Sequence, residues 1–240
     1  MNIFVDSADY SVGMALLDMV PVILFFVAGV FLLKDMYNKL VKGNYALLAT
    51  GTIMIFFAGL FKAIYKSLVA LNVCAWEALN LAFFPMQATG FLLLGAAMVG
   101  VFYSQKENKG NEPKTMAILP FSLLPLVFAE VAPFTSSMPF VVIQVIGATV
   151  FYAILFVIAL KMKIIPSYIL IAVAFVTMIG MGYLSTRASA GSENVTLWNW
   201  IAEADNTVSQ GALLAAVILM HRKGLASEDA YSFKKQPKGE

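Results

Sequence analysis

Two short polar motifs within an apolar chain hold the residues whose types and spacing could support chemistry. The sequence Glu-Ala-x-Asn occurs at 77–80 and again at 203–206, each time shortly after a tryptophan. In a helix, the carboxylate of Glu77 or Glu203 and the amide of Asn80 or Asn206 lie on one face. A charge inside a membrane helix is costly, so its presence at two matched places indicates a polar site built by internal duplication.

Further polar side chains lie at similar depth along the apolar segments. Lys62 and Arg187 approach the motifs from neighbouring segments; ion pairs of Lys62 with Glu77 and of Arg187 with Glu203 are the structural alternative. Gln87 and Gln210 reach the middle of their segments, where interhelical hydrogen bonds are the alternative role. The predicted ligand-binding set is Lys62, Glu77, Asn80, Gln87, Arg187, Glu203, Asn206 and Gln210.

The composition predicts an all-α integral membrane protein. Of the 240 residues 60% are hydrophobic, and the mean hydropathy is +0.82. A spanning helix needs about 20 mostly apolar residues. Seven stretches meet this requirement, at 11–33, 45–70, 77–103, 115–132, 138–160, 166–187 and 197–221.

The basic residues predict the orientation of these segments. Cytoplasmic loops carry an excess of lysine and arginine. Thirteen of the 16 basic residues fall on one side of the membrane if the N-terminus is outside and the C-terminus is cytoplasmic. The exceptions are Lys62, Lys66 and Arg187, which lie toward the outer ends of their segments. We therefore expect a multipass protein of the cell membrane with the N-terminus outside.

The doubled motif predicts a parallel 3+1+3 arrangement within one transmembrane domain over 1–223. The first repeat covers 11–103, a linker helix covers 115–132, the second repeat covers 138–221, and a polar cytoplasmic tail follows at 224–240. A shift of 126 positions also places Asp18 on Gln144. The alternative is that the amphipathic starts of membrane helices resemble one another by chance.

Several function classes are disfavoured by what the sequence contains. Cys74 is the only cysteine and His221 the only histidine, so a Cys/His metal site is not expected, and no cofactor is indicated. The basic residues are explained by topology, so nucleic-acid binding is not expected. A hydrolase would need a nucleophile with a base, or a carboxylate dyad such as Glu77 with Glu203. Basic residues near both acids favour ion pairing, so we expect no enzyme.

Two families resemble the predicted architecture. Seven helices with an outer N-terminus are similar to microbial rhodopsins, but the stretch 196–220 contains no lysine to hold retinal. Parallel three-helix repeats with a linker helix resemble the sugar-transporting SWEET family, whose Pro-Gln pair is missing from the segments at 11–33 and 138–160. Both likenesses concern architecture alone.

These observations lead to a functional expectation. The chain should bind a small polar or zwitterionic solute in a cavity open to the outside and carry it across the lipid bilayer. Its acids Glu77 and Glu203 would engage cationic groups or protons. Its bases Lys62 and Arg187 would engage anionic groups or hold the acids ionised, and its amides would supply neutral hydrogen bonds. The alternative is a membrane sensor or accessory subunit with the same outer pocket and no transport.

Overall fold

All secondary structure in the described part of the chain is α-helical. The computed structural model describes residues 10–37, 39–104, 138–189 and 194–227. The helices are α1 (Val12–Met36), α2 (Lys42–Ala70), α3 (Glu77–Ser104), α5 (Met138–Lys161), α6 (Ile165–Ser189) and α7 (Val195–Arg222). Six of the predicted segments are therefore helical, and the segment predicted over 115–132 lies outside the described residues.

Four of these helices, α1, α2, α3 and α5, are long and apolar enough to cross a membrane. The apolar part of α6 is shorter, covering Ile165–Met181, and α7 carries the second polar motif. Large apolar side chains such as Ile23, Val142 and Val176 point outward, each more than half exposed. Apolar flanks of this kind suit contact with lipid, so the chain has the features of a helical membrane protein.

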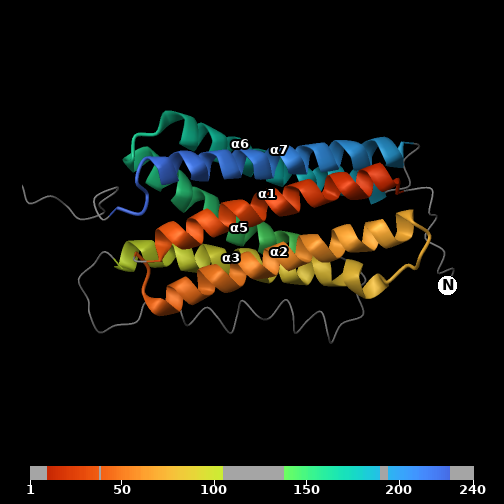
Figure 1. Cartoon of the computed structure of the whole chain (residues 1–240), viewed down its shortest axis with the longest axis horizontal. Coiled ribbons are helices and arrows are strands. Elements are labelled where there is room, and N and C mark those ends of the chain that lie inside the picture. The colour runs from red at the N-terminus through yellow and green to blue at the C-terminus, as the bar shows by residue number, and fades with distance from the viewer. Residues whose placement is uncertain (1–9, 38, 105–137, 190–193, 228–240) are drawn as a thin grey trace, which may run out of the picture.

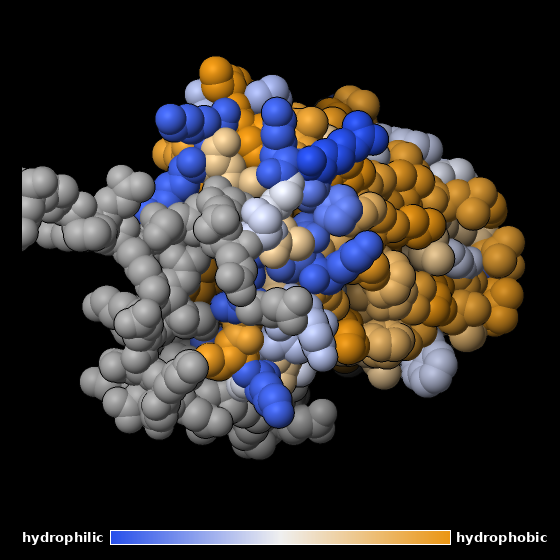
Figure 2. Space-filling view, turned by 60° about the vertical axis from the view of Figure 1, so that its left-hand side comes forward, coloured by the Kyte–Doolittle hydropathy of each residue, from blue (hydrophilic) through white to orange (hydrophobic). Residues whose placement is uncertain are grey.

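Hydrophilic residues gather at one end of the bundle, beside a flank that is largely hydrophobic (Figure 2). This end holds the last turns of α1, α5 and α7 and the first turn of α2. Its exposed basic side chains are Lys34, Lys42, Lys161, Lys163, Arg222 and Lys223. We refer to this end, defined by these six residues, as the basic end.

The helices form a closed ring in which α1, α2, α3, α5, α6 and α7 each pack against the next, and α7 packs against α1 (Figure 1). The first and last helices of the chain are therefore neighbours. Both start at the end opposite the basic end and run in the same direction. Any site between them is shared by the two halves of the sequence.

Glycines let the backbones of α2, α3 and α5 approach closely. A Cβ added at Gly51 of α2 would lie 2.7 Å from the carbonyl oxygen of Gly90 in α3. A Cβ added at Gly95 of α3 would lie 2.8 Å from the carbonyl oxygen of Gly147 in α5. Small residues are the usual means of tight packing between membrane helices. We call the contact between α3 and α5 at Gly95 and Gly147 the glycine contact.

Candidate functional site

A buried ion cluster joins three helices in the half of the bundle away from the basic end. The ammonium of Lys66, on α2, lies 3.2 Å from Oδ2 of Asp18 on α1 and donates a hydrogen bond to Oε1 of Glu203 on α7. All three side chains are less than a tenth exposed. Unpaired charges at such depth are very costly, and this arrangement gives each carboxylate a partner.

The shared lysine brings the two carboxyl groups close together. Asp18 and Glu203 both contact the ammonium of Lys66, and Oε2 of Glu203 is buried without a donor among the described residues. Two ionised carboxylates at this range repel one another, and a shared proton removes the repulsion. The cluster is therefore a carboxyl pair with one lysine bridging it.

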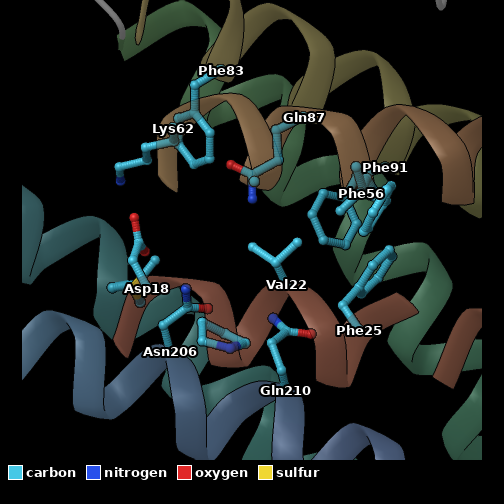
Figure 3. A pocket seen from close by; sticks show the side chains of 14 residues that line it. Asp18, Val22, Phe25, Phe56, Lys62, Phe83, Gln87, Phe91, Asn206 and Gln210 are labelled. Carbon is cyan, nitrogen blue, oxygen red and sulfur yellow. The ribbon is translucent and has the colours of Figure 1, made fainter. Parts of the chain in front are cut away.

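A small cavity lies beside the cluster, between α1, α2, α3 and α7 (Figure 3). Its volume is about 40 Å³. Because a water molecule needs roughly 10–15 Å³ of cavity volume, about three waters would fill the cavity. Its lining is Asp18, Pro21, Val22, Phe25, Ile55, Phe56, Gly59, Lys62, Phe83, Gln87, Phe91, Met181, Asn206 and Gln210.

The polar side chains of this lining approach the space from opposite sides. Lys62 and Gln87 extend from α2 and α3, and Asn206 and Gln210 extend from α7 (Figure 3). The ammonium of Lys62 lies 4.3 Å from the centroid of the Phe83 ring, a cation–π contact. The side-chain oxygen of Gln210 is buried and accepts no hydrogen bond from the described residues. The cavity thus offers a cation, a carboxylate and amides to one small ligand.

Four of the eight predicted ligand residues line this cavity, namely Lys62, Gln87, Asn206 and Gln210. Glu203 lies in the adjacent ion cluster. The first motif lies elsewhere: Glu77 accepts a hydrogen bond from the hydroxyl of Tyr65 at 3.3 Å, and Asn80 is half-buried outside the lining. The side chain of Arg187 lies outside the described residues. The two copies of the motif therefore occupy different surroundings.

The predicted set lacks Asp18 and Lys66, which complete the cluster. Lys66 follows Lys62 by four residues, so both lysines lie on one face of α2. Asp18 is the one charge in the first half of α1, which is otherwise apolar there. Together these two signals could have indicated a charged face shared by α1 and α2. Among the described residues, the partner of Glu203 is Lys66.

A second polar pair joins α1 and α7 near the basic end. Nδ1 of His221 lies 2.8 Å from Oδ1 of Asp35, whose side chain is fully buried. The imidazole also packs against the ring of Phe31, with 4.9 Å between the ring centroids. α1 and α7 are therefore joined directly at the basic end and through Lys66 of α2 at the other end. We call the pair Asp35–His221 the inner pair.

The polar groups of the cluster and of the cavity lining are carboxyl, ammonium and amide groups. Within the described ranges, no group of three or more His, Cys, Asp or Glu side chains could hold a metal ion. The cluster holds two carboxyls and one ammonium group, and the adjacent cavity is lined by one of these carboxyls, by the ammonium group of Lys62 and by three amides. No protein-family model, curated protein or solved structure matches the chain.

Proposed function

We propose that this chain is a multipass protein of the cell membrane that takes a small polar or zwitterionic solute from outside and moves it across the bilayer. The observation that carries this proposal is the cavity between Lys62 and Asp18. An ammonium and a carboxylate face it from different helices, and the unpartnered oxygen of Gln210 adds an acceptor. Opposite charges across a space this small suit a ligand that itself carries both charges.

The proposed architecture is seven spans in a parallel 3+1+3 arrangement. The order of helices around the ring supports it: replacing α1, α2 and α3 by α5, α6 and α7 preserves every neighbour relation. The closest associations, α2 with α3 and α6 with α7, also exchange with each other. Internal repeats around a polar site near mid-membrane are typical of secondary transporters.

The proposed orientation has the N-terminus outside and the basic end in the cytoplasm. The gathering of six exposed basic side chains at that end supports it, because lysine and arginine are enriched in cytoplasmic loops. The cavity then lies in the outer half of the bundle. This places the solute site on the side from which the solute would arrive.

One observation favours a sensor without transport. Beyond the polar groups, the cavity is bordered by apolar side chains such as Val22, Phe25 and Phe91, and α3 and α5 are closely packed further in. A path to the cytoplasm would require these helices to separate. A protein that only reports occupancy of the outer cavity needs no such movement.

Binding and uptake separate these two functions. The purified full-length protein would be tested with the small zwitterions glycine and β-alanine, first by thermal shift in nanodiscs and then by isotope uptake into proteoliposomes. Gln210→Leu should abolish the thermal shift because it removes the unpartnered acceptor. Gln144→Leu is the matched control, since Gln144 is half-buried on α5 and outside the cavity.

The outcomes are distinct. Uptake that depends on Gln210 supports a carrier. A thermal shift that depends on Gln210 without uptake supports the sensor. If neither solute shifts the melting temperature, or if both glutamine variants behave alike, the cavity is not the solute site and the proposal is wrong.

A further inference from the structure

The four charged side chains beside the cavity have formal charges that sum to zero. Asp18 and Glu203 are negative, and Lys62 and Lys66 are positive. Lys66 contacts both carboxylates, whereas Lys62 takes part in none of the ion pairs found among the described residues and faces the Phe83 ring. Lys62 is therefore the cation that an incoming anion can reach.

An anion cannot bind at Lys62 without disturbing this balance. A bound carboxylate would leave the cluster and ligand with a net charge of −1 in an apolar interior. Buried net charge is strongly unfavourable in such surroundings. The anion must therefore arrive with a positive charge that the cluster can hold.

The carboxyl pair is the place for that charge. Asp18 and Glu203 are held at one ammonium, that of Lys66, and one oxygen of Glu203 has no donor among the described residues. A proton shared by the carboxyl groups of Asp18 and Glu203 would remove the repulsion between them. It would also supply the hydrogen bond that Oε2 of Glu203 lacks. Lys66 would keep its place against both groups, so no rearrangement of the helices is needed.

Building on the proposed function, we propose that the Asp18–Glu203 pair takes up one proton when a carboxylate binds at Lys62. The carrier would then be a proton-coupled symporter of small monocarboxylate anions, whereas a zwitterion brings its own positive charge and binds without the proton. The charges balance: the proton adds one positive charge, the carboxylate adds one negative charge, and the occupied site returns to neutrality. No bond other than that to the proton forms or breaks.

The other titratable groups near the pair have different partners. The hydroxyl of Tyr65 bonds Glu77, which brings the acid of α3 to that tyrosine. The ring centroid of Tyr10 lies 5.8 Å from the ammonium of Lys66. Asp205 faces α6, where its Oδ2 lies 3.6 Å from the position of a Cβ added at Gly180. The described side chains of α5 and α6 place no acid or lysine beside the pair.

Formate is a suitable probe because it has three heavy atoms, about as many as the waters that the cavity can hold, and it stays ionised over the neutral and mildly acidic range. Its affinity for the full-length protein in nanodiscs would be measured calorimetrically as a function of pH. Linkage to one proton predicts an affinity that rises by up to about tenfold for each unit of pH decrease. A pH-sensitive dye should report uptake of one proton per bound formate.

Variants test each half of the coupling. Asp18→Asn replaces the acid by a neutral amide that resembles its protonated form, so formate should bind with little dependence on pH. Glu203→Gln should behave alike, which guards against a folding failure of either variant. Lys62→Met should abolish binding at every pH. Asp205→Asn is the control and should keep the full slope.

Infrared difference spectroscopy provides a readout that needs no ligand. Acidification should produce a carboxylic-acid carbonyl band that is lost in Asp18→Asn and in Glu203→Gln. If formate binds with no pH dependence, or if both variants keep the slope and the band, the coupling is wrong while solute binding stands. If the band is present but neither formate nor the zwitterions bind, the proposed function fails and carboxylate symport fails with it.

Discussion

Lys66→Met is the sharpest test of the buried cluster. Methionine keeps most of the length and removes the ammonium that bridges Asp18 and Glu203. At an effective dielectric constant of about 20, two unit charges 3.2 Å apart attract by about 5 kcal/mol. Desolvation offsets part of this, and breaking a buried pair from one side usually costs about 3–5 kcal/mol. We expect a loss of this size in the free energy of unfolding.

The assay is equilibrium unfolding in mixed micelles, followed by circular dichroism. Because native proteins are stable by only about 5–15 kcal/mol, the expected loss is a large share of the total. Lys223→Met is the control: this exposed lysine should change stability by no more than about 0.5 kcal/mol.

Rescue distinguishes charge from shape. Adding Asp18→Asn and Glu203→Gln to Lys66→Met removes the buried charges that the lysine leaves behind. A cluster replaced as a whole by neutral groups is often as stable as the original. The triple variant should therefore recover most of the loss. A loss below about 1 kcal/mol in the single variant, or no recovery in the triple variant, would refute the view that Lys66 holds two buried carboxylates together.

Three further changes probe the packing, the inner pair and the orientation. Gly147→Ala should cost roughly 1–3 kcal/mol of unfolding free energy because its Cβ would lie 2.7 Å from a backbone oxygen of α3. Gly211→Ala is the control and should be neutral or slightly stabilising, because the nearest atom to its Cβ would lie at 3.9 Å. Equal effects of the two changes would count against the close packing of α3 and α5. His221→Ala should lower the free energy of unfolding by about 1–3 kcal/mol, because it leaves the buried Oδ1 of Asp35 without its partner. His221→Gln should lose less, because an amide can still donate a hydrogen bond. Unfolding measurements in which the Gln variant is no more stable than the Ala variant would contradict this contact. An impermeant maleimide should label the exposed Cys74 in intact cells and spare a Lys163→Cys variant in a Cys74→Ser background; the reverse pattern would overturn the proposed orientation.

The positions of the helices could be predicted from hydropathy because long apolar runs leave few other solutions in a membrane. The partners of the charged residues could not. Most faces of α1, α2 and α5 are apolar, so the sequence does not say which face of each helix turns toward the bundle. That rotation decides that Lys66 meets Glu203 and that Glu77 meets Tyr65.

The lining of the cavity could be predicted from the sequence where polar residues recur at helical spacing. Asn206 and Gln210 are four residues apart on α7, and both line it. A single charged residue such as Asp18 forms no helical pattern in the sequence. Its role became visible only through its contact with Lys66 in the structure. A duplicated motif does not reveal its contacts either, because two copies of the same sequence can pack against different side chains.

The two contacts between the halves of the ring differ in their mechanics. At the glycine contact, α3 and α5 meet backbone to backbone, and any sliding there encounters hard steric walls. Between α1 and α7, discrete polar links stand near the two ends, and Asp18 and Asp35 are separated by 17 residues, about 26 Å of helix. If α1–α3 rotated relative to α5–α7, the axis of rotation would lie at the glycine contact. The distances within the two polar links would then change by different amounts. Separating α1 and α7 at the end away from the basic end would strain the carboxyl cluster and leave the inner pair in contact, and separating them at the basic end would do the reverse.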